Sequence, residues 1–200
     1  TALRPAGEGD LLARLAALRA WTAPECARGA PLLAARHAAG LVRECHGDLH
    51  LANIVRVDGI PLPFDCLEFN PALRHIDVIA DLAFLFMDLQ RRGLSALAWR
   101  VVNAWAEHTG DYEGLATLRF FAVSRALLRA KVALLRAAQH AAQAWAAFER
   151  DLALAESLAA ARQGDAEAPA KLFEIVYADL RALAGRHVRG ARNAGPSATS

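Results

Sequence analysis

The sequence contains only two lysines, Lys131 and Lys171, only three cysteines, and no long apolar run. Because no stretch of about 18 uncharged apolar residues occurs, we expect no membrane-spanning helix. The cysteines are odd in number and form no C-x-x-C pair, which favours a reducing, cytoplasmic environment over a disulfide framework. A basic-then-apolar signal pattern is also lacking at the N-terminus.

The net charge is only +2 over 200 residues, so whole-chain electrostatics argue against a nucleic-acid or membrane partner. No G-x-x-x-x-G-K-[ST] loop occurs, and no glycine-rich phosphate loop precedes His46. Hydrophobic residues make up 55% and charged residues 22%, which is enough for a packed core and argues against global disorder. The length fits one domain with a short appendage.

The most informative segment is 44–70, ECHGDLHLANIVRVDGIPLPFDCLEFN. It places Asp48 four spacers before Asn53, and Asp65 follows across an expected β-hairpin. This order is typical of a kinase catalytic loop followed by a metal-binding strand end. The segment therefore predicts phosphoryl transfer.

The chemistry of that reaction explains the residue types. A carboxylate must orient the attacking hydroxyl, and Mg²⁺, which prefers oxygen ligands, must hold the phosphates of ATP or GTP. We therefore assign Asp48 as the base or orienting carboxylate, and Asn53 and Asp65 as metal and nucleotide ligands. His46 would brace the loop, and Gly47 would allow a backbone shape that a Cβ would hinder.

The two ligand positions are expected to meet through a tight hairpin. Residues 53–57 alternate and are β-branched, the Asp-Gly dipeptide at 58–59 signals a type I′ turn, and residues 60–64 return. Such a hairpin brings Asp65 back beside Asn53.

The candidate site residues are also weighed against structural alternatives. Asp65 lies between Phe64 and Phe69, where we expect an uncompensated charge to be costly unless a metal binds it. Glu68 is either a further metal partner or a surface carboxylate. Asp48 could also cap a turn, and Asn53 could be a turn residue.

Helices are expected over most of the remaining chain, which predicts an α+β, mostly α fold with one hairpin. Asp10 is expected to cap the first helix. The expected helices cover 11–21, 31–41, 77–91 with an end near Gly93, 94–108 closed by Gly110, and 112–140 and 141–162, which are either two helices or one helix broken near 139–143.

Three motifs together resemble the aminoglycoside phosphotransferase family within the protein-kinase-like fold. They are HGDLHLAN at 46–53, FDCLEFN at 64–70 and RHIDVIADLAFL at 74–85. The resemblance is closest to a bacterial branch often fused to a P-loop ATPase, and it covers Thr1 to about Ala160. It implies an ATP-dependent kinase that transfers the γ-phosphate to a small-molecule hydroxyl.

The resemblance also implies roles for single residues. Asp48 matches the catalytic base, and Asn53 and Asp65 match the metal ligands. Asp77 or Asp81 matches a buried carboxylate that braces the catalytic loop, and the other is expected to pair with Arg74.

The family's small N-terminal lobe carries an ATP-contacting lysine, but both lysines of this sequence follow the catalytic loop. We therefore expect residues 1–162 to be the large lobe only, a truncated form whose small lobe or fused ATPase would be its partner. Residues 163–200 are expected to form an amphipathic helix over Pro169–Val188 and a disordered tail. The stretch from about 163 to 192 resembles the beginning of extracytoplasmic-function-type sigma factors.

Two other functions stay open from the sequence. One is a metal-dependent hydrolase, in which His46, Asp48 and His50 would line one face of a strand and hold Zn²⁺ or Mn²⁺. The other is a non-catalytic, kinase-like scaffold.

Overall fold

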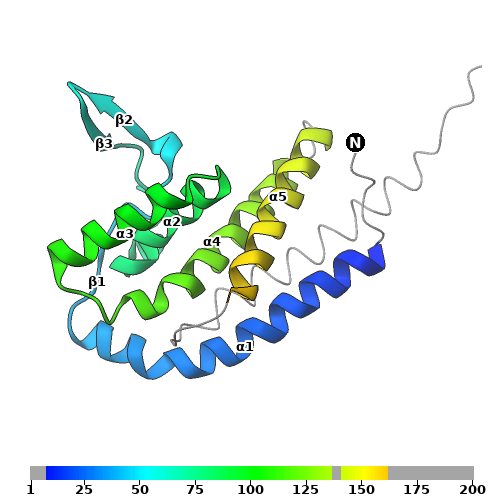
Figure 1. The fold of residues 1–200 in the computed structure, drawn as a ribbon, viewed down its shortest axis with the longest axis horizontal. Coiled ribbons are helices and arrows are strands. Elements are labelled where there is room, and N and C mark those ends of the chain that lie inside the picture. Colours follow the sequence, from blue (N-terminus) through cyan, green and yellow to red (C-terminus); the bar gives the residue numbers. More distant parts are fainter. Residues whose placement is uncertain (1–7, 137–140, 162–200) are drawn as a thin grey trace, which may run out of the picture.

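The computed structural model describes residues 8–136 and 141–161. This part of the chain is α+β and mostly helical, as predicted, with two small two-stranded sheets (Figure 1). In chain order the helices and strands are α1 Glu8–Ala38, β1 Val42–Glu44, the 3₁₀ turn η1 Leu51–Asn53, β2 Ile54–Val57, β3 Ile60–Pro63, the 3₁₀ turn η2 Pro71–Leu73, β4 His75–Asp77, α2 Val78–Arg91, α3 Ser95–Thr109, α4 Leu115–Leu135 and α5 Ala141–Ala160.

The core lies among helices α1, α2, α4 and α5, and α3 packs on α2. Helix α2 is buried on nearly all sides, which explains its almost uninterrupted apolar sequence. Helix α1 contributes Leu11, Leu15 and Leu18 at the spacing of one helix face, and all three are at most 2% exposed. The buried helix α2 therefore forms a rigid base beneath the segment that carries the predicted site.

Helix α1 corrects the predicted start of the chain. The two helices expected over 11–21 and 31–41 are one helix, Glu8–Ala38, and Asp10 lies inside it rather than at its cap. Pro24 and Pro31 lie within this helix, are both exposed, and are seven residues apart on its outer side. The helix bends along its length (Figure 1), as expected where proline removes a backbone hydrogen bond.

The predicted hairpin is confirmed. Strands β2 and β3 pair antiparallel, with Val57 opposite Ile60. Both turn residues have positive φ, 50° at Asp58 and 85° at Gly59, as a type I′ turn requires. The hairpin projects from the helical body (Figure 1).

The second sheet was not predicted. Strand β1 pairs antiparallel with β4, with Val42 opposite Asp77, and the amide of Val78 donates to the carbonyl of Leu41 at 3.1 Å. The chain therefore leaves α1 and returns to α2 at one place, and all the predicted catalytic and metal-binding residues lie on the intervening segment.

The later helices agree with prediction. Helix α2 begins after Asp77 and ends before Gly93, and α3 is closed by Gly110, whose φ is 74°. The long C-terminal pattern resolves into two helices, α4 and α5. The expected helix at 169–188 and the tail lie outside the described residues.

Within residues 8–136 and 141–161, no helix is both long enough and apolar enough to cross a bilayer.

Candidate functional site

The segment 45–50 is an irregular loop that one carboxylate of α2 holds in place. Both oxygens of Asp81 accept backbone hydrogen bonds, from His46 N at 3.0 Å and from Gly47 N at 2.9 Å. Hydrogen bonds to an ionised group are stronger than neutral ones, so two of them from one side chain fix this turn firmly. Asp81 is thus the loop-bracing carboxylate of the predicted pair.

A second carboxylate of α2, not assigned from the sequence, holds the other end of the loop. Asp88 is completely buried and accepts from Leu51 N at 3.1 Å and from Arg92 Nε at 3.0 Å. Seven residues separate it from Asp81, which places both on one helix face. The sequence signal for this role is the position of Asp88, an acidic residue within the apolar run of α2, two helical turns after Asp81.

Gly47 has the special backbone that was predicted for it. Its φ is 82°, and a Cβ at this position would lie 3.0 Å from the carbonyl oxygen of Leu73 and 3.0 Å from Leu67 Cδ1. Glycine is therefore required both by conformation and by space.

Asp48 and Asn53 are in contact. The amide nitrogen of Asn53 donates to the carbonyl oxygen of Asp48 at 3.1 Å and to its carboxylate at 3.3 Å. Asn53 is 8% exposed, whereas 34% of the Asp48 side chain is exposed. The carboxylate of Asp48 is therefore part-exposed; the buried amide of Asn53 holds it, and its Oδ2 also lies 3.4 Å from His50 Nε2. The Asn53 amide oxygen has no hydrogen-bond partner within the described ranges.

His46 connects the loop to the hairpin. Its Nδ1 accepts from Asp48 N at 3.3 Å, and its Nε2 lies 2.8 Å from the carbonyl oxygen of Phe64. The amide of Phe64 in turn donates to the carbonyl of Asn53 at 2.9 Å. The end of the hairpin is therefore tied to His46 in the loop and to Asn53 in the turn that follows it, and Asp65 is the next residue along the chain.

The expected burial of Asp65 is wrong. Asp65 is exposed, and its neighbours Phe64 and Phe69 are 49% and 80% exposed. The desolvation argument for a compensating metal therefore does not hold. Its backbone is unusual instead, because its φ of 59° is rare for a residue with a side chain, and such strain often occurs at functional positions. Glu68 is exposed on an irregular segment, the setting of a surface carboxylate.

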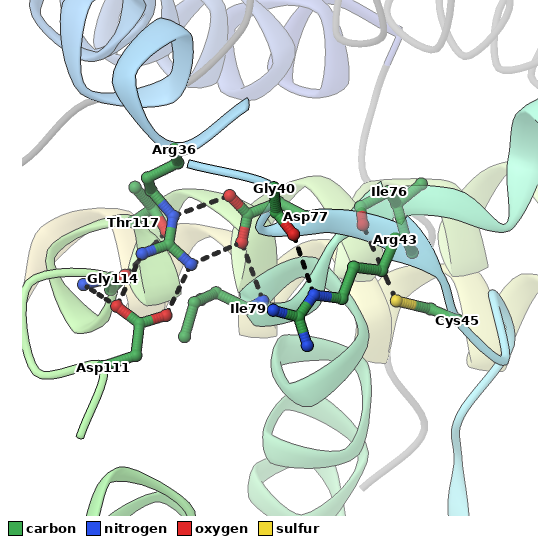
Figure 2. A network of polar contacts seen from close by, with 10 residues as sticks. All are labelled: Arg36, Gly40, Arg43, Cys45, Ile76, Asp77, Ile79, Asp111, Gly114 and Thr117. Carbon is green, nitrogen blue, oxygen red and sulfur yellow. Dashed lines mark hydrogen bonds and ion pairs between the residues drawn. The ribbon is translucent and has the colours of Figure 1, made fainter. Parts of the chain in front are cut away.

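The pairing of Asp77 with Arg74 is also wrong. Asp77 is buried and forms two hydrogen bonds with Arg36, at 2.7 and 2.8 Å (Figure 2). Arg36 bonds Asp111 in the same way, at 2.7 Å to each oxygen, and Arg74 pairs with Glu44.

Asp77 has a structural role at the helix start. It caps α2 by accepting from the amide of Ile79 at 2.9 Å, as Figure 2 shows. The Arg36 network thus joins α1, the start of α2 and the loop before α4, and it lies beside the site rather than in it.

Burial shifts two pKa values at the loop. The pKa of His50 is lowered, mainly by burial, although the charge of Asp48 opposes this effect. His50 is therefore neutral at neutral pH, and its Nδ1 accepts from the amide of Ala52 at 3.2 Å. Burial, together with the charges of Asp81 and Asp77, raises the pKa of the Cys45 thiol to about 11, so this thiol is not an activated nucleophile.

The hydrolase alternative is less well matched by this geometry. The segment 46–50 is not a strand, so the expected common face does not form. Both ring nitrogens of His46 are already engaged within the loop and hairpin. No group of three His, Cys, Asp or Glu side chains suited to a metal occurs in the described part of the chain.

Comparison with known proteins finds relatives whose names state no function. The chain is 38% identical over 124 residues to uncharacterized protein Rv2004c of Mycobacterium tuberculosis (strain ATCC 25618 / H37Rv), and equally to uncharacterized protein Mb2027c of Mycobacterium bovis (strain ATCC BAA-935 / AF2122/97). Each match covers 62% of this chain but 25% of the relative. The chain thus spans about a quarter of the length of the relatives it matches. No protein-family profile and no solved structure matches it.

Proposed function

We propose that the chain contributes the catalytic loop and metal-binding residues of a kinase-like phosphotransferase of the aminoglycoside phosphotransferase type. The observation that supports this most is the coupled loop and hairpin. Asp48 is presented to solvent, Asn53 holds it, and the end of the hairpin is tied to Asn53 immediately before Asp65.

Each residue has a distinct role in this proposal. Asp48 accepts a hydrogen bond from the acceptor hydroxyl, orients it towards the γ-phosphate and takes its proton. The amide oxygen of Asn53 and the carboxylate of Asp65 would hold Mg²⁺, which in nucleotide enzymes needs only one or two protein ligands besides phosphates and water. The metal would neutralise phosphate charge during transfer.

The rigid base of the loop suits this chemistry. Phosphoryl transfer depends on positioning, so its carboxylate must stay within a small distance of its working place. Asp81 and Asp88 hold three backbone amides of the loop from the buried helix α2. His46 would fix the distance between the loop and the metal-binding hairpin.

A non-catalytic, kinase-like scaffold is the second candidate. The segment before the loop is occupied by helix α1, and it contains no lysine that could contact ATP phosphates. Metal and nucleotide binding separates the two candidates.

We would titrate the chain with Mn²⁺ and then with MgATP, by calorimetry and by the loss of the free Mn²⁺ electron-spin signal. The informative variant is Asp65→Asn, because Asn tolerates a positive φ and removes only the charge. Asp58→Asn is the matched control, since Asp58 is also an exposed Asp with positive φ on the same hairpin. Binding that Asp65→Asn weakens and Asp58→Asn retains supports the proposal. A folded chain that binds neither ligand would favour the scaffold.

Transfer itself is tested with γ-labelled ATP and a panel of small hydroxyl compounds. Asp48→Ala should abolish transfer and leave the far-ultraviolet circular dichroism unchanged, since the Asp48 side chain is part-exposed. Full activity in this variant would contradict the assignment of the base.

A further inference from the structure

Helix α4 carries two arginines, Arg125 and Arg129, that form no ion pair with a carboxylate of residues 8–136 and 141–161. They are four residues apart and therefore share one helix face. Arg125 is only 8% exposed, yet the only hydrogen bond formed by its guanidinium within the described residues is a long one, 3.4 Å from Nε to the carbonyl oxygen of Ala80. Arg129 Nε is buried with no hydrogen-bond partner in the described part of the chain.

Six other arginines of the described structure differ from these two. They form ion pairs with carboxylates: Arg14 with Glu149 and Glu156, Arg28 with Glu25, Arg36 with Asp77 and Asp111, Arg74 with Glu44, Arg91 with Asp151, and Arg92 with Asp88. Burying a guanidinium without such a partner is costly. Burial lowers the pKa of Arg125, and the nearby charges of Asp81 and Asp48 oppose that effect without forming an ion pair.

Both arginines are close to the proposed chemistry. The guanidinium carbon of Arg125 lies 4.9 Å from the centre of the Phe84 ring, and the ring of His50 lies 5.7 Å from the same ring. Arg125 and His50 therefore pack against the same aromatic ring of α2. Arg129 follows one turn later on the same face of α4, and its charge helps to lower the pKa of His50 and also opposes the rise that burial causes in the pKa of Asp151.

We propose that Arg125 and Arg129 bind a phosphate or carboxylate oxyanion beside Asp48, which would supply the anionic partner that the described protein lacks. This inference rests on the proposed function, because it defines a ligand group at the same site. The oxyanion belongs either to the γ-phosphate of the donor or to an acidic group of the hydroxyl acceptor.

If the oxyanion belongs to the acceptor, the pair also restricts the acceptor class. Two cations beside the orienting carboxylate would then repel a polycationic acceptor such as an aminoglycoside and attract a hydroxyl compound that carries phosphate or carboxylate. The guanidinium fork suits both oxyanions, since it donates two parallel hydrogen bonds. In that case we expect an acidic acceptor.

The test is the binding of inorganic phosphate to the 200-residue chain, measured by calorimetry and by the broadening of the ³¹P resonance. Arg125→Gln and Arg129→Gln are each expected to weaken binding roughly tenfold or more. Arg100→Gln is the control, because Arg100 is an exposed arginine on another helix, α3. Thermal unfolding shows that each variant is folded, and Arg125→Lys, which keeps the charge, should retain part of the affinity.

The outcomes are separable. Phosphate binding that both α4 variants lose, with Mn²⁺ binding intact, supports the oxyanion site. Competition then identifies the source: if saturating MgATP displaces phosphate, the site holds the γ-phosphate, and if both bind together, the site belongs to the acceptor. This inference would be overturned if the unmodified chain and all folded variants bound phosphate equally well, or if none bound it. Failure of the proposed function is seen separately, as a loss of binding in the Mn²⁺ titration.

Discussion

Replacing Asp81 with asparagine should loosen the loop at residues 45–50 while leaving the shape of the side chain unchanged. In the structure the two carboxylate oxygens of Asp81 accept from His46 N at 3.0 Å and from Gly47 N at 2.9 Å. Asparagine keeps one acceptor oxygen but places an NH₂ group, a donor, against the other backbone amide. One amide of the loop therefore loses its partner.

The expected cost follows from these contacts. A hydrogen bond to a charged group contributes about 1.5–3 kcal/mol, and an unsatisfied amide adds a desolvation cost. Asp81 is half-buried, so water relieves part of this cost. We therefore expect Asp81→Asn to lower the free energy of unfolding by about 2 kcal/mol, which is a shift of the urea midpoint by about 1 M.

The assay is urea unfolding, monitored by circular dichroism and by tryptophan fluorescence. Glu107→Gln is the matched control, since it makes the same change of charge at an exposed position on α3. Mn²⁺ binding should weaken in Asp81→Asn because the loop that orients Asn53 is no longer held. If Asp81→Asn unfolds within about 0.5 kcal/mol of the control, the bracing role is refuted.

Three further predictions follow from the same geometry. Gly47→Ala should destabilise the fold by about 2–4 kcal/mol, because the φ of Gly47 is 82° and a Cβ would lie 3.0 Å from a backbone oxygen. Gly9→Ala in α1 should not destabilise it, because a Cβ there meets nothing within 4 Å. Chemical denaturation compares the free energies of unfolding of the two variants. Hydrogen bonds from Arg36 hold the pKa of Asp111 below the usual value of an aspartate, so its stabilising effect is present above that usual value and is lost as pH falls through the lower, folded pKa. Asp111→Asn should therefore lose less stability than the unmodified chain between pH 7 and about pH 3, and equal losses would refute this. Because the pKa of the Cys45 thiol is about 11, Cys45 should react with iodoacetamide at pH 8 more slowly in the folded chain than in the unfolded chain. Peptide mass spectrometry measures the two rates, and equal rates would contradict the burial of this thiol.

Features that depend on neighbouring residues could be predicted from the sequence. The type I′ turn at 58–59 and the special backbone of Gly47 follow from local conformational preference. The ends of α2 and α3 follow from Gly93 and Gly110, which both have positive φ. The mostly helical fold follows from the periodicity of the apolar residues.

Features that depend on distant residues could not be predicted in this way. Strands β1 and β4 have three residues each, and neither has a pattern of its own. The partner of Asp77 is Arg36, 41 positions earlier, rather than the sequence neighbour Arg74. Helix α1 continues through two prolines because its buried face packs on the other helices and both rings lie on the exposed side.

In the candidate site, too, the features that depend on neighbouring residues could be predicted and those that depend on distant residues could not. The order of Asp48, Asn53 and Asp65 indicated a hairpin-linked arrangement, and the structure forms this hairpin. The exposure of Asp65 could not be predicted, because a charged residue between two phenylalanines has no fixed burial until the tertiary packing is known. The role of Asp88 was missed since an acid in an apolar run has many possible partners.

The antiparallel pairing of β1 with β4 closes residues 41–78 into an insert with a fixed base. The amide of Val78 meets the carbonyl of Leu41, and Arg36 and Asp77 form two hydrogen bonds beside that junction. The tip of the insert, at 58–59, is exposed and far along the chain from both ends. We therefore expect that residues added or removed at the tip leave the anchor of Asp48 unchanged, which makes the tip the place where a change of length should be tolerated best.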